Sequence, residues 1–153
     1  MRCLPGWFAA GMAMCFLGAS AFAHAEGKIG VFDAWIRAAP PGSHMLAGYA
    51  TLKNTGDTRV SVLTVQSDEF REASIHETVV DRGVSKMREV SRLDIDPGAT
   101  VELKPGGRHL MLSDPRQAIR VGEKIGMVFL LADGTRVQTY FDVVAPDASE
   151  TGD

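Results

Sequence analysis

The sequence predicts an all-β fold, a sandwich or a barrel, and three observations support this prediction. Short runs of alternating, β-branched residues recur about every ten residues along most of the chain. Clusters of Gly, Pro, Asn and Asp, which are typical of tight turns, separate these runs. No stretch long enough for a stable helix shows an apolar period of 3.6 residues. We therefore expect strands throughout.

Each expected strand has this alternating pattern and ends at a turn signal. In chain order the strands cover residues 30–37, 46–54, 59–66, 70–77, 85–90, 100–104, 108–112, 124–131 and 136–144. The turn signals are Pro40-Pro41-Gly42, Asn54-Thr55-Gly56-Asp57, Asp81-Arg82-Gly83, Asp96-Pro97-Gly98, Pro105-Gly106-Gly107 and Asp133-Gly134. Trp35 is expected to be a core aromatic residue, and Asp94 and Asp96 are expected to be turn residues.

Residues 1–25 have the features of a secretory signal peptide. Arg2 is positively charged, the segment from Trp7 to Ala23 is almost wholly apolar, and Ala23-His24-Ala25 matches an A-x-A cleavage site. The apolar run is too short and too rich in small residues for a membrane span. We expect export to the periplasm without stable membrane insertion, a single domain at residues 26–144, and a disordered acidic tail at residues 145–153.

Composition excludes several classes of function. The chain has 16 Lys and Arg against 19 Asp and Glu, so its formal charge of −3 does not favour nucleic acid. Both cysteines, Cys3 and Cys15, lie in the signal segment, which excludes structural disulfides, thiolate zinc sites and blue-copper sites in the exported protein. The sequence has no G-x-S-x-G, H-E-x-x-H or phosphate-binding glycine motif. We therefore do not expect an enzyme.

One predicted strand carries a histidine and a methionine on a face that should point away from the core. In residues 108–112, the period of two places Leu110 and Leu112 on one face and His109 and Met111 on the other. If the leucines are buried, His109 and Met111 stand side by side outside the core.

The same reasoning applies to two further residues upstream. Ile75 is the expected core residue of its strand, so His76 should face away, and Met87 shares its face with polar neighbours. Two histidines and two methionines on polar faces suit copper(I), a soft ion that matches imidazole nitrogen and thioether sulfur, whereas calcium and magnesium prefer oxygen. The alternative is that the methionines fill gaps in the core and the histidines are solvated.

The register of the hairpin between His76 and Met87 is left open by the sequence. A two-residue loop at Asp81-Arg82 would place His76 directly opposite Met87 on one face. A type I turn with a bulge at Gly83 would instead shift the register by one residue and separate them.

The spacing of the four residues resembles that of the PCuAC family of periplasmic copper(I) chaperones. His76, Met87, His109 and Met111 reproduce its H-x10-M-x21-H-x-M arrangement. The framework residues that extend the resemblance over residues 30–144 are Asp33-Ala34-Trp35-Ile36-Arg37, Pro40-Pro41-Gly42, Gly48-Tyr49, Asn54-Thr55-Gly56 and Pro105-Gly106-Gly107. The resemblance implies a cupredoxin-like Greek-key β-sandwich or barrel.

It also implies a function in which these four side chains bind copper(I) and pass it to an acceptor. The acceptor would be a respiratory cytochrome oxidase subunit or another periplasmic copper chaperone, and the carrier itself is expected to be a monomer. Three alternatives are a metal-free immunoglobulin-like binding module, a copper-resistance carrier or storage protein, and a copper-dependent redox enzyme.

Two features depart from the family pattern. Some relatives have a C-terminal extension rich in His and Met, but residues 145–153 contain neither. The chain also carries His44 and Met45 after its Pro-Pro-Gly turn, and His24 near the cleavage site. Whether His24, His44 or Met45 assists in copper binding stays open at this point.

Overall fold

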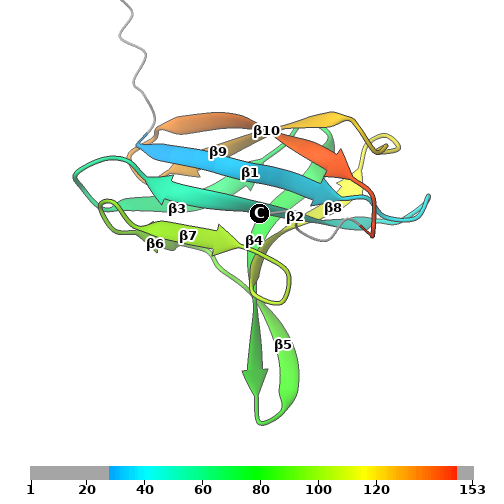
Figure 1. Cartoon of the computed structure of the whole chain (residues 1–153), viewed down its shortest axis with the longest axis horizontal. Helices are drawn as coiled ribbons and strands as arrows, with labels where there is room; N and C mark the ends of the chain where they lie inside the picture. Colours follow the sequence, from blue (N-terminus) through cyan, green and yellow to red (C-terminus); the bar gives the residue numbers. More distant parts are fainter. Residues whose placement is uncertain (1–27, 148–153) are drawn as a thin grey trace, which may run out of the picture.

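The computed structural model describes residues 28–147, which form strands joined by turns (Figure 1). This confirms the predicted all-β class. The strands are β1 (Ile29–Arg37), β2 (Met45–Asn54), β3 (Val60–Gln66), β4 (Phe70–Asp81), β5 (Val84–Glu89), β6 (Leu93–Ile95), β7 (Thr100–Leu103), β8 (Arg108–Pro115), β9 (Lys124–Leu131) and β10 (Arg136–Val144).

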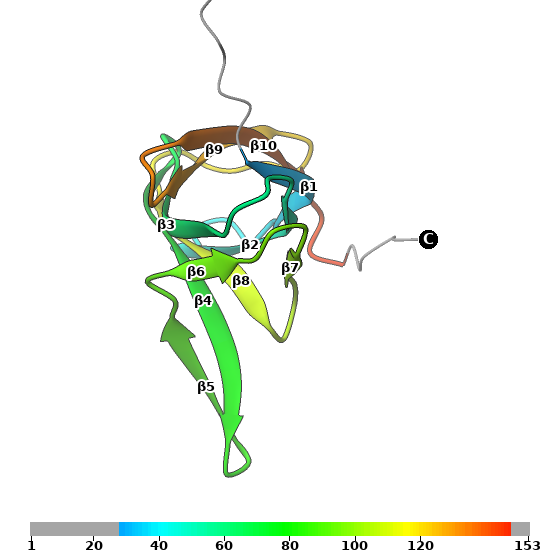
Figure 2. The same ribbon diagram turned by 90° about the vertical axis from the view of Figure 1, so that its left-hand side faces the viewer.

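The strands belong to one continuous sheet that curls around a central core (Figure 2). Its order is β5-β4-β8-β2-β1-β10-β9-β3-β6, and β7 pairs with β2 beside this path. β1 and β10 run parallel, whereas the remaining pairings are antiparallel. The molecule is therefore a barrel-like sandwich in which β8 and β2 lie between the first strand and the projecting β4–β5 hairpin.

The core is apolar and follows the strand period of two. In β9, Ile125, Met127, Phe129 and Leu131 are all buried, and the residues between them are only half-buried or less. Burial of a side chain of this size contributes about 1.5–3 kcal/mol to folding. Other fully buried large side chains are Phe70, Phe141, Ile36, Leu52, Ile95, Leu110 and Leu112. The core thus gives each of these strands a defined inner and outer face.

A bulge in β1 changes which residues of this strand face the core. The pairing of β1 with β2 shifts by one residue between Phe32 and Trp35, and Asp33 has a φ of 50°. An extra residue in one strand reverses the facing of every residue that follows it. Ile36 is therefore fully buried, and Trp35 is only partly buried. The prediction that Trp35 is a core residue is wrong for this reason.

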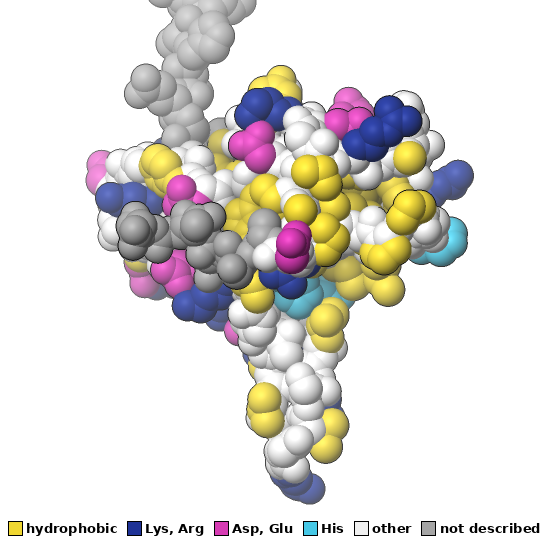
Figure 3. All heavy atoms as spheres, turned by 45° about the vertical axis from the view of Figure 1, so that its right-hand side comes forward, with side chains coloured by type: hydrophobic (Ala, Val, Ile, Leu, Met, Phe, Trp, Pro, Cys, Tyr) yellow, Lys and Arg dark blue, Asp and Glu magenta, His cyan; other side chains and the backbone are white. Residues whose placement is uncertain are grey.

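The β4–β5 hairpin projects from the barrel (Figures 1 and 2). Residues 78–87, which we call the arm, pair with each other, and the Thr78 N–H also donates to the Gly107 carbonyl at 3.2 Å. Strand β4 extends to Asp81, four residues beyond the predicted end at 77. Hydrophobic side chains and histidines gather where the arm meets the barrel (Figure 3).

The loop of this hairpin differs from both alternatives considered for the sequence. Asp81 pairs with Val84, so the two loop residues are Arg82 and Gly83, with φ values of 51° and 80°. Two residues with positive φ form a type I′ turn, whose twist matches that of the flanking strands. The register consequently differs by two residues from the one that a loop at Asp81-Arg82 would give, and a shift of two preserves the face of each side chain.

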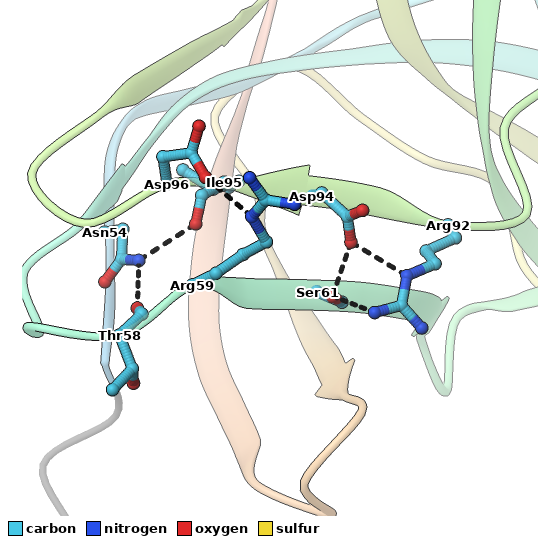
Figure 4. Close-up of polar contacts among 8 residues, drawn as sticks. All are labelled: Asn54, Thr58, Arg59, Ser61, Arg92, Asp94, Ile95 and Asp96. Atoms are coloured by element: carbon cyan, nitrogen blue, oxygen red, sulfur yellow. Dashed lines mark hydrogen bonds and ion pairs between the residues drawn. The ribbon is translucent and has the colours of Figure 1, made fainter.

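A short strand that the sequence did not predict, β6, makes polar contacts with β2 and β3 (Figure 4). Asn54 is fully buried, and its Nδ2 donates to the carbonyls of Thr58 and Ile95 at 2.7 and 2.9 Å. Asp94 lies in β6, so its assignment to a turn is wrong. Its carboxylate accepts hydrogen bonds from Ser61 and from Arg92.

Several sequence predictions concern residues beyond this range. The predicted signal peptide at residues 1–25, including His24, lies outside the described residues, as do residues 148–153 of the predicted tail. Within residues 28–147, no helix is long and apolar enough to cross a membrane.

Candidate metal centre

The two histidines of the predicted site lie side by side on neighbouring strands. His76 of β4 pairs directly with His109 of β8, and their ring centroids are 6.2 Å apart with an interplanar angle of 33°. Residues that pair directly in a sheet point to the same face. Both imidazoles therefore project from one face of the β4–β8 pair.

Met111 lies on this face too. It follows His109 by two residues in β8, and it pairs with Ser74, which precedes His76 by two residues in β4. This face is the outer one, because the intervening residues Leu110 and Ile75 are buried in the core. The expected division between core leucines and outward His109 and Met111 is thus present in the structure.

Met87 lies on the same outer face as the histidines, but it does not pair directly with either of them. His76 pairs with Glu89 of β5, whereas Met87 pairs with Thr78, one step of two residues toward the tip of the arm. Met87 is therefore a diagonal neighbour of His76, and such neighbours are about 7–8 Å apart, within reach of long side chains. The structure thus places all four predicted residues on one face, with Met87 at the edge of the group.

The four side chains differ in exposure. Met87 is 57% exposed, and His76, His109 and Met111 are partly buried. A metal ion held here would lie close to the surface, with its most accessible ligand on the arm.

The hydrogen bond of His109 determines which ring nitrogen is free. Its Nδ1 lies 3.1 Å from the carbonyl oxygen of Gly107, and a carbonyl can only accept, so Nδ1 carries the proton. This tautomer leaves the lone pair on Nε2, as is common for histidines that bind metal ions.

His76 has the complementary arrangement. Its Nε2 lies 3.1 Å from the hydroxyl oxygen of Ser74, which can accept a hydrogen bond from the ring. Its Nδ1 is buried and has no hydrogen-bond partner among the described residues. A buried ring nitrogen without a partner is costly to leave unsatisfied, and a bound metal ion would satisfy it.

The opposite face of the same three strands carries a charged row. Glu77 of β4 pairs with Arg88 of β5 and Arg108 of β8, and its carboxylate lies 2.8 and 3.1 Å from their guanidinium groups. The hydrogen bond from Arg88, followed by the charges of both arginines, lowers the pKa of Glu77 below its ordinary value. This row joins β5, β4 and β8 directly behind the two histidines.

An aromatic group borders the site on the side of β1 and β2. Trp35 packs against Tyr49 with ring centroids 4.4 Å apart and an interplanar angle of 41°, and the Arg37 guanidinium lies 5.5 and 5.7 Å from the two ring centroids. Arg37 pairs with Ala47, which in turn pairs with Met111, so this group shares the outer face of the site. Trp35 reaches this position because of the bulge in β1.

Sequence reasoning missed the residues that support the four candidates. Ser74 and Gly107 could have been noticed as polar or flexible residues two positions before His76 and His109 in the sequence. The pairing of Glu77 with Arg88 and Arg108 joins three strands, and no local pattern indicates it. Among residues 28–147, no group of three or more His, Cys, Asp and Glu is arranged to hold a metal ion.

Comparison with known proteins identifies a family that matches almost all of the described residues. The family model described as "Putative lipoprotein LpqE-like" matches residues 29–143. "Putative lipoprotein Lxx21020" of Leifsonia xyli subsp. xyli is 34% identical over 130 residues, covering 82% of this chain and 77% of the relative. An uncharacterized protein of Rickettsia prowazekii, RP573, is 35% identical over 91 residues, which are 59% of this chain and 50% of the relative.

Solved structures with the same fold are PCuAC domains. The copper-bound PCuAC domain from PmoF2 superposes with a TM-score of 0.66 at 25% identity, covering 78% of this chain and 95% of that domain. The apo PCuAC domain from PmoF1 gives 0.66 at 26% identity, with coverages of 78% and 96%. The copper(I) form of DR1885 from Deinococcus radiodurans gives 0.63 at 25% identity, with coverages of 81% and 83%. The predicted resemblance and the cupredoxin-like fold are thereby confirmed.

Proposed function

The chain belongs to the LpqE-like family and has the fold of PCuAC domains, and on this premise we propose that it binds copper(I) through His76, Met87, His109 and Met111. The observation that carries the proposal is the sheet register, which brings two imidazoles and two thioethers to one outer face. These are the donor types that soft copper(I) prefers. Two similar structures, one copper-bound and one with copper(I), support the choice of ion.

We further propose that the protein is a carrier and not an enzyme. The ion would be held without bond chemistry and released to a partner by exchange of one ligand at a time. The 57% exposure of Met87 supports this role, because an incoming ligand could replace the thioether at the open edge of the site. The partner would be a respiratory oxidase subunit or a second periplasmic copper chaperone.

The proposed compartment is the periplasm. The support comes from the signal-like segment at residues 1–25 and from similarity to a protein described as a lipoprotein. A chain that carries no cysteine after residue 15 also has no thiol that copper could oxidise there.

The experiment that tests copper binding is an anaerobic titration of the purified protein with copper(I), read as the number of tightly held equivalents. We expect one tight equivalent in the wild type and its loss in Met111→Leu, which removes the sulfur but keeps the volume. Met127→Leu is the matched control, because Met127 is fully buried in the core and should not touch the ion. Full retention of the tight equivalent by Met111→Leu would contradict the ligand set.

A second experiment separates delivery from storage or resistance. The copper(I)-loaded protein is mixed with a soluble copper-accepting domain of an oxidase, and the transferred metal is measured over time. Transfer supports delivery, whereas retention of copper against an acceptor that binds it more tightly would favour storage.

A further inference from the structure

Methionine is distributed unevenly over the structure. Residues 28–147 contain four methionines, and Met127 is the one that belongs to the core. Met87 and Met111 lie on the outer face described above, and so does Met45. Methionine usually fills gaps in cores, so three thioethers on one outer face are not explained by packing.

The position of Met45 follows from the pairing of β2 with β8. Met45 pairs with Ser113, and Ala47 pairs with Met111, so Met45 is a diagonal neighbour of Met111 on the same face. Met87 is a diagonal neighbour of His76 in the same way, so Met45 and Met87 lie at opposite ends of the group. Met45 is 60% exposed, and its thioether is therefore accessible.

His44, the residue just before β2, carries a nitrogen donor at the same end of the strand as Met45. Its side chain is 87% exposed, and its Nδ1 lies 3.3 Å from the Asp114 carboxylate. The Asp114 N–H donates to the His44 carbonyl at 2.7 Å, which fixes this corner of the loop against the end of β8. Because Nδ1 faces the carboxylate, Nε2 is the ring nitrogen that remains for a metal ion.

We propose that Met45 and His44 form a second, weaker copper(I) site, with Met111 as a ligand shared by both sites. The five donors of the outer face then form a diagonal series from Met87 through His76, His109 and Met111 to Met45. An ion could enter or leave at the Met45 end by exchanging thioether and imidazole ligands one at a time, with no change in its oxidation state. This inference rests on the proposed function, because it assumes copper(I) at the first site.

The test uses the protein labelled with ¹³C at the methionine methyl groups and titrated with silver(I), a redox-stable probe with the same ligand preference. We expect the first equivalent to shift the methyl signals of Met87 and Met111, and the second to shift that of Met45. The Met127 signal serves as an internal control in the core. Met45→Leu should weaken binding of the second equivalent by about tenfold or more and leave the first unchanged.

The possible outcomes separate this inference from the proposed function. If no methionine signal moves, copper(I) binding itself is contradicted. If Met87 and Met111 shift while Met45 does not, the first site stands and the second is overturned. His44→Gln tests the nitrogen donor independently, because it keeps a hydrogen-bonding side chain but removes the imidazole; binding of the second equivalent at wild-type strength in this variant would remove His44 from the site.

Discussion

His76 and His109 pair directly across β4 and β8, and their imidazole rings are 6.2 Å apart by centroid. Because Glu77 pairs with arginines of β5 and β8 on the reverse face, the strands that carry these rings are tied together behind the site. The nitrogen half of the proposed centre is thus fixed by the sheet, and one of its thioethers, Met87, lies on the less constrained arm.

This difference predicts unequal roles for the two methionines. Met87→Leu and Met111→Leu should each weaken copper(I) binding by about tenfold or more, which corresponds to about 1.4 kcal/mol. Loss of Met87 should act mainly on the release rate, because this exposed side chain lies at the open edge of the site. Competition with a chromogenic chelator gives the affinity, and stopped-flow transfer to the same chelator gives the rate. Equal effects of both variants on the release rate would contradict the assignment.

The type I′ turn of the arm predicts opposite effects for its two residues. Arg82→Asn should stabilise the protein by about 0.5–1 kcal/mol, because asparagine tolerates positive φ and Asn-Gly favours this turn. Gly83→Val should destabilise it by about 1–2 kcal/mol, since a β-branched residue is strained at a φ of 80°. Urea denaturation measures both free energies. Similar free energies of unfolding in all three proteins would show that the turn does not adopt this conformation.

Replacement of Asn54 should lower the free energy of unfolding more than replacement of most other polar residues. Its side chain donates to two carbonyls and accepts from the Gly56 N–H at 2.9 Å, and it is fully buried. Each buried partner that Asn54→Ala leaves unsatisfied costs about 1–3 kcal/mol. Asp57→Ala, at a nearby exposed residue, is the control and should change the unfolding free energy by less than about 0.5 kcal/mol. A loss in Asn54→Ala no larger than that of the control would be inconsistent with the network in Figure 4.

The lowered pKa of Asp94 should account for part of the change in folding stability with pH. The Ser61 hydroxyl and then Arg92 donate hydrogen bonds to its carboxylate and lower its pKa. A pKa that is lower in the folded than in the unfolded state adds stability above the unfolded value, and this contribution is lost as pH falls through the folded value. Asp94→Asn should therefore reduce stability at neutral pH and flatten its decline in acid. Denaturation curves across the acidic range, with the exposed Asp57→Asn as control, measure this; an unchanged decline in Asp94→Asn would contradict it.

Alternation was sufficient to predict which residues of β8 and β4 face outward. Leu110 and Ile75 are strongly apolar and flanked by polar or soft residues, so a period of two identifies their faces without tertiary information. The turn residues likewise marked most strand ends. The outward placement of His76, His109 and Met111 could therefore be predicted from local sequence alone.

Three features could not be predicted, and two of them depend on backbone conformations that the residue types do not favour. Asp33 and Arg82 both adopt positive φ, which is uncommon for residues other than glycine. The first creates the bulge that turns Trp35 outward, and the second moves the hairpin loop by one position. Strand β6 contains only three residues, too few to show a period.

The location of Met87 at the base of the arm has a consequence for how long an ion would stay bound. The arm is joined to the barrel mainly through β4, so substitutions at its tip can alter its bending without disturbing the core. The dwell time of the metal could then change while the imidazole geometry stays constant. The rate of copper release could then be changed by substitutions at the tip of the arm, several residues away from any donor atom. The affinity for copper would be set separately, by the ligands themselves.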